Sequence, residues 1–366
     1  MRRIRRIRGF YLGILLGALC TLFLCLDCGA VGAAQNTATV KSCKISSNGK
    51  KVTVQAKVTK KTKAMGKKLY LIAYDSYEGV GKTTKKKPVA SVKAKKGTVK
   101  FSIALNDGES DSRLFSKFAV AYKSGKKYKI ISTAKYITNP EKLASYKSTY
   151  PKTYSKKGLQ AEDPADSIAL GTQHTVLNWT LNSILQKGGA GYRYKGKTYY
   201  FNYQLLDYYD ELVHQYNESG SKVTVILLLQ NSPREDLNAM MYKGSSANYS
   251  GINTSTKAGS RAFEAVMSYL AERYGKKSHL VSGWILGNEI GNTREWNYGG
   301  KKSLSAYMDN YVRTFRIVNT AVRSVNKNAH VYLSLDYHWN YDPDGDGKEY
   351  FSSKAILNTF YKKLKA

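Results

Sequence analysis

Cysteine is scarce in this 366-residue chain, which contains four. Three of them, Cys20, Cys25 and Cys28, lie close to the N-terminus, so the rest of the chain keeps Cys43 alone and cannot form an intrachain disulfide. The fold is therefore expected to depend on burial of apolar side chains, which a chain of this length can supply. We expect Cys43 to be a small buried hydrophobic residue and not a reactive thiol.

Acidic residues are also few, because 26 Asp and Glu stand against 59 Lys and Arg, for a formal net charge of +33. The imbalance is greatest in residues 35–152, which hold 28 basic and 6 acidic residues. Such a surface attracts anionic polymers with strong salt dependence. Aromatic residues are not interleaved with the lysines as base stacking requires, so specific nucleic-acid recognition is not expected. A solvated surface and binding to an anionic cell-wall polymer both remain open.

Motifs for metal-dependent hydrolysis and nucleotide chemistry are missing, since the chain has no HExxH and no glycine-rich phosphate loop after a strand. Residues 342–347, DPDGDG, resemble the first half of an EF-hand-like calcium loop, with oxygens from Asp342, Asp344 and Asp346. The usual Glu at the end of such a loop is replaced by Ser353. No cofactor is expected, and calcium at these aspartates competes with a plain acidic turn.

The N-terminus has the order of an export signal. Five arginines fall in the first eight residues, an apolar segment follows to about Leu26, and small residues continue through Ala34. This order predicts a secretory signal peptide at residues 1–34 and a secreted or cell-surface protein. A retained membrane anchor is the alternative.

Residues 36–140 alternate apolar and polar side chains with a period of two, and lysine fills many outer positions. This alternation is typical of half-buried antiparallel strands, and about seven of them in about 100 residues predict a basic all-β sandwich. The clearest strands are 52–58, 69–74, 99–105, 118–122 and 128–132. The turns are predicted at Asn48-Gly49, Asn106-Asp107-Gly108 and Ser124-Gly125. No titratable cluster occurs here, so we expect a supporting or binding role.

After a linker at residues 141–154, residues 155–366 alternate apolar strands with helical periods. Strand followed by helix, five times over, implies a parallel sheet with right-handed crossovers. The predicted strands are 156–160, 174–181, 223–230, 281–289 and 331–339. The predicted helices are 163–170, 203–217, 259–274, 304–325 and 353–365.

Residues 281–289, VSGWILGNE, form an apolar run that ends in Asn288 and Glu289. A run this apolar suits a strand covered on both faces, which would place the carboxylate where the strand leaves the core. An ordinary polar residue at a strand end is the alternative. With WILGNE at the end of the fourth predicted strand, the chain resembles the clan A glycoside hydrolases, which are TIM barrels whose Asn-Glu at that position supplies the general acid/base.

The resemblance covers residues 156–366 and implies a multidomain protein, with the all-β sandwich followed by a β/α (TIM-type) barrel that is incomplete. It implies that Glu289 protonates the leaving glycosidic oxygen and that Asn288 hydrogen-bonds the neighbouring sugar hydroxyl. An eight-stranded barrel needs three more units, and the clan carries its nucleophilic Glu on the seventh strand. We therefore expect an inactive fragment of a longer retaining hydrolase of a β-linked polysaccharide. A non-catalytic carbohydrate-binding or wall-adhesion protein on a degenerate barrel is the alternative.

Weaker substrate-binding candidates follow the fifth predicted strand. Asp336 is a possible second carboxylate, with hydrogen bonding inside the rim as the alternative. Tyr337, His338 and Trp339 could form a wall on which sugar rings stack, with aromatic core packing as the competitor. The remaining candidates belong to the second predicted strand: His174, Asn178 and Trp179. His174 and Asn178 flank this strand and could reach the rim, with a core or surface role as the favoured alternative.

Overall fold

The computed structural model describes residues 37–106, 112–147, 152–232, 234–244 and 246–365. The predicted signal peptide at residues 1–34 lies outside the described residues, as do Asp107 and Gly108 of one predicted turn. Residues Ala38–Ala366 form one compact unit. Within the described part of the chain, no helix is long and apolar enough to cross a membrane.

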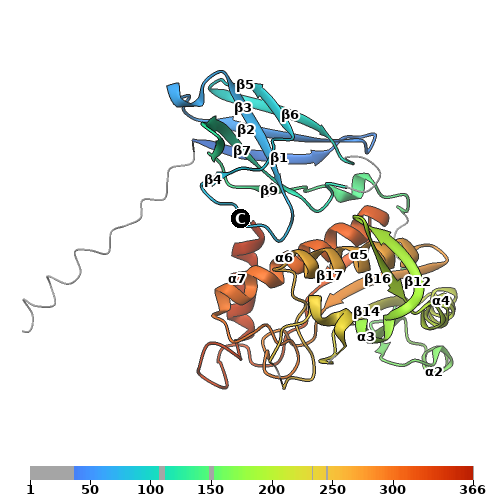
Figure 1. Ribbon diagram of the computed structural model, residues 1–366. Coiled ribbons are helices and arrows are strands. Elements are labelled where there is room, and N and C mark those ends of the chain that lie inside the picture. Colours follow the sequence, from blue (N-terminus) through green and yellow to red (C-terminus); the bar gives the residue numbers. More distant parts are fainter. Residues whose placement is uncertain (1–36, 107–111, 148–151, 233, 245, 366) are drawn as a thin grey trace, which may run out of the picture. The chain divides into compact units, whose positions relative to one another are not determined.

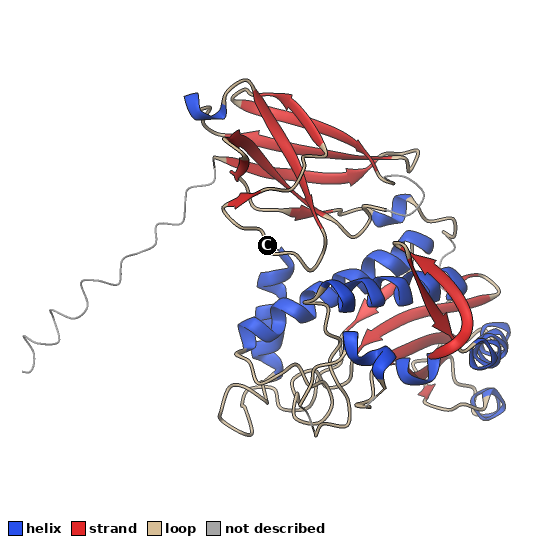
Figure 2. Cartoon of the chain, in the orientation of Figure 1, coloured by secondary structure: helices blue, strands red, loops and turns tan. Residues whose placement is uncertain are grey.

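The N-terminal part contains antiparallel strands in two sheets (Figures 1 and 2). One sheet has the order β1-β2-β6, and the other has the order β4-β8-β7-β3-β5, with β9 paired to β7. The strands are β1 Ala38–Ile45, β2 Lys51–Val58, β3 Lys68–Tyr74, β4 Thr83–Thr84, β5 Ala90–Lys93, β6 Gly97–Ala104, β7 Lys117–Ser124, β8 Lys127–Ile130 and β9 Lys135–Tyr136. Two short 3-10 helices are η1 Lys63–Met65 and η2 Pro140–Lys142.

Both N-terminal sheets contribute to one hydrophobic core, because alternate side chains of each strand point inward. Val54 of β2, Leu71 of β3 and Phe118 of β7 are fully or almost fully buried there. Cys43 is buried in the same core, and burial raises the pKa of its thiol to about 12. The prediction of an inert cysteine is therefore confirmed. The predicted turn at Asn48-Gly49 is also present, with Gly49 at φ 72°.

Strand β7 departs from the predicted alternation. Ala119 and Ala121 are as buried as Phe118, and they pack with Ile72 and Tyr74 of β3 in a second, smaller cluster. The prediction of one solvated lysine-bearing face is wrong for this strand. Its small alanines fit a central strand that is covered on both faces.

The C-terminal part is built on five parallel strands that pair in chain order, β10-β11-β14-β16, with β17 beside β16. These strands are β10 Gly158–Leu159, β11 His174–Thr180, β14 Lys222–Leu228, β16 His279–Leu286 and β17 His330–Tyr332. The helices are α2 Pro164–Ala169, α3 Leu181–Ile184, α4 Tyr203–Glu218, η3 Glu235–Met240, α5 Lys257–Tyr274, α6 Leu304–Val325 and α7 Ser353–Lys365. The predicted parallel sheet is confirmed.

The long helices begin at side chains that cap them. Asn202 accepts a hydrogen bond from Leu205 N at the start of α4, and Thr256 accepts one from Gly259 N at the start of α5. Ser303 does the same for α6. Each cap satisfies a backbone amide that has no partner inside the helix. These caps explain why the predicted helix boundaries agree with the structure to within two residues.

Three segments differ from the predicted pattern. Residues 185–201 form an antiparallel hairpin of β12 Leu185–Tyr194 and β13 Lys197–Phe201, and β15 Gly275–Lys276 pairs antiparallel with β16. Strand β17 ends at Tyr332, although the prediction extended it to Trp339. The reason is a local turn in which the Asp336 carboxylate accepts a hydrogen bond from His338 N at 2.9 Å.

The two faces of the parallel sheet differ in burial. Val223, Val225 and Leu227 of β14 are fully buried in a core shared with the helices, whereas Ile226 between them is partly exposed. Register places Ile226 in one row with Asn178, Ile285 and Tyr332 of the neighbouring strands. One face is therefore covered by helices, and the row through Ile226 lies on the more open face.

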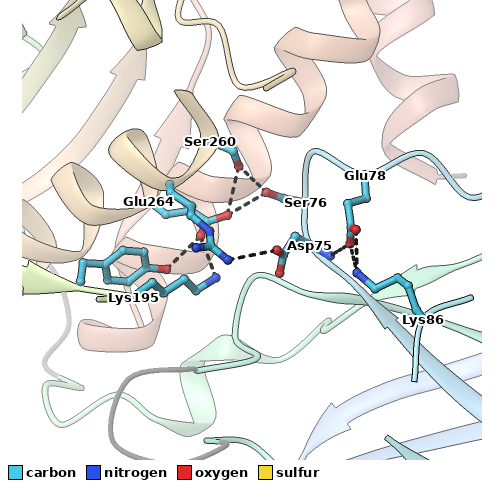
Figure 3. A network of polar contacts seen from close by, with 9 residues as sticks. Asp75, Ser76, Glu78, Lys86, Lys195, Ser260 and Glu264 are labelled. Carbon is cyan, nitrogen blue, oxygen red and sulfur yellow. Dashed lines mark hydrogen bonds and ion pairs between the residues drawn. The ribbon is translucent and has the colours of Figure 1, made fainter. Parts of the chain in front are cut away.

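A buried charged network links the loop after β3 to the helical part of the chain (Figure 3). Glu264 of α5 is 1% exposed and accepts hydrogen bonds from Ser76 Oγ at 2.7 Å and Ser260 Oγ at 3.2 Å. Tyr194 OH at 2.9 Å and Lys195 Nζ at 3.1 Å complete its partners. A carboxylate this buried is tolerated because its oxygens are hydrogen-bonded and its charge is paired.

Candidate active site

Four of the sequence-predicted residues lie at one edge of the parallel sheet. Asn288 and Glu289 follow β16, while Asp336 and His338 follow β17. Because β16 and β17 are parallel neighbours, their carboxyl ends leave the sheet on the same side. The structure thus places the predicted acid/base and the predicted second carboxylate on adjacent segments.

The backbone at Glu289 is unusual. Glu289 has φ 40°, in the left-handed region that side-chain-bearing residues rarely adopt, and Gly287 has φ 71°. A Cβ at Gly287 would stand 2.6 Å from Asn297 Oδ1, so glycine is required there. A non-glycine residue in this region costs about 1–3 kcal/mol and persists only where its surroundings hold it.

Hydrogen bonds from the segment after β17 hold the Glu289 turn. Glu289 N donates to Ser334 Oγ at 3.3 Å, and the same hydroxyl donates to Asn288 Oδ1 at 3.2 Å. Ile290 N donates to the Ser334 carbonyl at 3.0 Å. A further bond comes from helix α6, where Tyr307 OH donates to the Ile290 carbonyl at 2.9 Å. The backbone of the Glu289 turn is therefore held by its neighbours.

The segment before α7 closes over the same turn. Phe351 N donates to the Gly291 carbonyl at 2.9 Å, and a Cβ at Gly291 would lie 2.5 Å from the Phe351 carbonyl oxygen. Tyr311 OH anchors the end of β16 through the Leu286 carbonyl at 2.8 Å. The two loops are in backbone contact that only glycine permits at this position.

The Glu289 carboxyl is partly exposed, and its pKa is raised. Burial is the largest cause, followed by the negative charges of Asp336 and Glu295, while His338 lowers the pKa. A carboxyl that keeps its proton to higher pH is suited to general acid work.

Asp336 is more buried than Glu289, with its side chain 1% exposed. It accepts hydrogen bonds from His338 N, from Ser353 Oγ at 3.3 Å and from Tyr350 OH, and it lies 3.2 Å from His338 Nδ1. Burial and the hydrogen bond to Asp336 raise the pKa of the Tyr350 phenol. Because its oxygens are occupied, Asp336 orients His338 and Tyr350, and it biases Glu289 through its charge.

The predicted aromatic wall is only partly exposed. Tyr337 is 85% exposed and Trp339 is 50% exposed, and Tyr341 two residues further on is also exposed. His338 is buried, with its ring centroid 3.9 Å from that of Tyr337 and its Nδ1 within hydrogen-bond distance of Asp336 and Tyr350. Including His338 in a sugar-stacking surface was therefore wrong, because its ring is used inside the cluster.

The candidates on β11 separate by burial. Trp179 is fully buried, stacked on Tyr209 at 4.8 Å and packed against Tyr274 and Trp284, so its predicted contact with substrate is wrong. Asn178 is exposed on the open face of the sheet. His174 begins β11 and so lies at the opposite edge of the sheet from Glu289, which favours the alternative of a core or surface role over a place at the rim.

The acidic loop uses its carboxylates locally. Asp342 accepts from Asp344 N and Gly347 N, Asp346 accepts from Lys348 N, and Asp344 pairs with Arg294 at 3.0 Å. No group of three or more His, Cys, Asp or Glu side chains that could hold a metal ion occurs within the ranges that the structure describes. Calcium at Asp342, Asp344 and Asp346 stays a prediction from sequence.

Glu289 lines none of the larger hollows found among the described residues. A cavity of about 990 Å³ is lined by β13, η3 and α5, and it includes Tyr199, Arg234 and Asp236. None of the sequence-predicted site residues lines it. Glu289 is therefore on an open edge and not in an enclosed pocket among those hollows.

Sequence reasoning missed Ser334, Tyr350 and Glu295. Ser334 stands two residues before Asp336, so a period of two along an extended segment could have placed both at one edge. Tyr350 carried no signal, because its position depends on how the loop of residues 340–350 returns to the sheet. Glu295 lies six residues after Glu289, in a loop segment for which the sequence pattern predicted no element.

Several solved structures are weakly similar to the chain. A Family 1 β-glucosidase from Thermotoga maritima is 17% identical with a TM-score of 0.33, and the match covers 54% of this chain and 40% of that protein. A GH5_18 protein from Bifidobacterium longum subsp. infantis is 16% identical with a TM-score of 0.32, covering 51% and 40%. The virulence factor SghA from Agrobacterium tumefaciens is 18% identical with a TM-score of 0.35, covering 50% and 38%.

The chain thus spans about two fifths of the length of these proteins, and similarity at this level assigns no activity. No curated protein matches the chain. The model of a family described as "Family of unknown function (DUF5722)" matches residues 149–366. Since that match covers more than half of the sequence, the chain belongs to the DUF5722 family.

Proposed function

We propose that this protein is a glycoside hydrolase-like protein in which Glu289 is the general acid/base for cleavage of a β-linked polysaccharide. In this proposal the N-terminal sheets are an all-β sandwich, and the parallel sheet with its helices is part of a β/α barrel. Asn288 hydrogen-bonds the sugar, and Tyr337 and Trp339 offer aromatic faces to it.

One observation carries the proposal. Glu289 is held in a strained turn at the carboxyl edge of a parallel sheet, and its pKa is raised by burial and by Asp336. Strain of this kind is retained where a side chain must point in one direction, and a raised carboxyl pKa is what protonating a leaving oxygen requires.

Retention of configuration needs a second carboxylate about 5–5.5 Å from the acid, acting as nucleophile. Asp336 is an unsuitable nucleophile because its oxygens are engaged by His338, Tyr350 and Ser353. The proposal therefore assigns Asp336 to positioning and leaves the nucleophile to a residue outside this cluster. A form of the protein that lacks such a nucleophile is expected to be inactive.

A non-catalytic carbohydrate-binding protein is the second candidate. Tyr337 and Trp339 are exposed while the neighbouring Asp336 is fully hydrogen-bonded, and Glu289 lies outside the cavities described above. This arrangement favours a stacking surface at least as much as a reaction chamber.

The test is a glycan array and a hydrolysis screen of the longest natural form of the protein, beside Glu289→Gln and the matched control Glu218→Gln. Glu218 is an exposed carboxylate at the end of α4. The proposal expects Glu289→Gln to keep glycan binding and to lose at least about a hundredfold in hydrolysis, the usual share of general acid catalysis. Equal hydrolysis by both variants would remove Glu289 from the mechanism. Binding without hydrolysis by any form would favour the second candidate.

Export and wall binding complete the proposal. Residues 1–34 would direct secretion, and the lysine-rich N-terminal part would bind an anionic cell-wall polymer. Mass analysis of the protein from its native host would find the new N-terminus at Gln35. Sedimentation with purified cell walls would decrease as salt is raised if the contact is ionic.

A further inference from the structure

A basic cavity lies between strands β7 and β9 of the N-terminal sheets and helices α6 and α7. It has a volume of about 380 Å³, within the lower range of small-ligand sites. Its lining contains six cationic side chains and one carboxylate, Asp309. The cations are Lys117, Lys135, Arg313, Arg316, Lys363 and Lys365.

The one carboxylate of the lining does not neutralise the centre of the cavity. Asp309 pairs with Lys363 at 2.6 Å, and its side chain is 61% exposed. Lys117, Arg313 and Arg316 form no ion pair with a carboxylate among the described residues. All three are partly buried, so water screens their charges less than it would screen surface lysines.

The three central cations come from two facing elements. Arg313 and Arg316 lie three residues apart on α6, and Lys117 lies on β7. Tyr136 stands between them, with Lys117 Nζ 5.6 Å and the Arg316 guanidinium 5.0 Å from its ring centroid. Two arginines one turn apart on a helix, opposite a lysine, present a converging set of donors.

The crowding of these charges is visible in Lys117. Burial and the positive charges of Arg313 and Arg316 together lower the pKa of its ammonium to about 8, against the opposing effect of Glu78. A bound anion would relieve this repulsion. The cavity thus holds unpaired positive charge at a cost that a ligand of opposite charge would offset.

We propose that this cavity binds a phosphate-type oxyanion, a phosphate or sulfate group of charge −2, between Lys117 and the Arg313–Arg316 pair. A dianion matches the number of unpaired cations better than a carboxylate, and guanidinium groups bind such oxygens in pairs. The volume leaves room for more than one tetrahedral group, so pyrophosphate is expected to bind more tightly than inorganic phosphate. This site is independent of the proposed hydrolase chemistry at Glu289.

The experiment is isothermal titration of the whole protein with pyrophosphate, inorganic phosphate, sulfate and acetate, in about 150 mM salt so that weak surface pairing is screened. The variant is Lys117→Gln with Arg313→Gln, and the control is Lys57→Gln on the exposed side of β2. Arg316 is left in place because it donates to the Leu364 carbonyl at 2.7 Å and so supports α7.

We expect pyrophosphate to bind the unaltered protein and the control equally, and to bind the double variant at least tenfold more weakly, about the value of one charge-assisted hydrogen bond. No binding to the unaltered protein, equal binding to the double variant, or equal binding of acetate would each overturn the proposal.

If the double variant does not fold, the pH dependence of pyrophosphate affinity in Lys117→Arg tests the proposal instead. Affinity of the unaltered protein must fall between pH 7 and 9.5 as Lys117 loses its proton, and Lys117→Arg must remove that fall. A pH profile that is the same in both proteins would overturn the proposal.

Discussion

The backbone amide of Glu289 donates to the hydroxyl of Ser334, a residue of the neighbouring strand segment, at 3.3 Å. That hydroxyl in turn donates to Asn288, so one small side chain holds both residues of the Asn-Glu pair. The strained φ of Glu289 is maintained from outside its own turn.

Ser334→Ala should therefore loosen the turn. The substitution removes two hydrogen bonds, each with a net value of about 0.5–1.5 kcal/mol, and leaves the Glu289 amide unpaired. We expect faster hydrogen exchange across residues 288–292 and a slightly lower free energy of unfolding. Ser305→Ala, at an exposed position of α6, is the control and should change neither. Unchanged exchange in Ser334→Ala would show that the turn is held by its other contacts.

Glu289→Gln should stabilise the protein near neutral pH. The pKa of Glu289 is raised in the folded state, so the folded state binds more protons than the unfolded state just above the ordinary value of 4.5. The ionised Glu289 carboxylate therefore opposes folding. The free energy of unfolding falls as the pH rises from the ordinary carboxyl pKa of 4.5 through the raised pKa of the folded state. Urea unfolding should show the variant more stable at pH 7 and equal to the unaltered protein below about pH 4. A difference that is independent of pH would contradict this assignment.

Glu264→Gln should destabilise the protein strongly. The substitution leaves the buried Lys195 without its counter-charge, and breaking a buried pair from one side typically costs about 3–5 kcal/mol. The control is Glu78→Gln, which breaks the more exposed pair with Lys86 and should cost about 1 kcal/mol or less. Chemical denaturation of both variants gives the comparison. Equal losses would mean that Lys195 finds another partner or water.

Two of the tryptophans, Trp179 and Trp339, should respond differently to truncation. Trp179→Ala opens a cavity in the core and should cost about 3–5 kcal/mol. Trp339→Ala removes a half-exposed ring and should leave the free energy of unfolding within about 0.5 kcal/mol. If the aromatic surface binds glycan, Trp339→Ala should also weaken glycan binding. The control is Tyr154→Ala, which removes an exposed ring elsewhere in the sequence and should leave glycan binding unchanged. Thermal unfolding and the glycan array measure these effects.

Lys117 should make stability depend on alkaline pH. Its pKa is lowered from 10.5 to about 8 in the folded state, so between these values the unfolded state binds more protons. Stability should then rise from pH 8 to about pH 10.5, provided that no anion is bound. Lys117 faces Arg313 and Arg316 of α6, Tyr136 of β9 and Glu78 of the loop after β3. Lys117→Gln should flatten the rise, and a rise that survives the substitution belongs to another group.

Much of the C-terminal architecture followed from periodicity. The apolar run before Glu289 and the heptad-like stripe from Leu304 to Val325 both gave the correct element within a few residues. Both could be predicted because burial of one face or stripe gives the apolar residues of each element a single regular spacing. The hairpin at residues 185–201 was not predicted, because glycines interrupt the alternation of its first strand and its inward side chains, among them Tyr194 and Phe201, pack on α5.

The candidate site was harder to read than the fold. Glu289 and Asp336 were found because each ends an apolar segment, but the alternation LSLDYHW extended β17 too far. A hydrogen bond that the Asp336 carboxylate accepts from His338 N forms a turn there, and such a bond is not visible in the alternation of apolar and polar residues. Trp179 was misassigned for a related reason, since a strand sequence does not tell which of its two faces the helices will cover. The sandwich, the incomplete barrel, the domain boundaries and the substrate remain predictions.

Ser76 reaches across to a carboxylate of α5, and Phe115 packs into the same core as the helices. A recombinant piece that begins at residue 149, where the family match starts, would lack both side chains. Glu264 would lose the hydrogen bond that Ser76 Oγ donates to it, and the apolar side chains that Phe115 covers would be exposed to water. Such a shortened protein is expected to aggregate because it lacks these contacts, so a recombinant form should begin no later than Ala38.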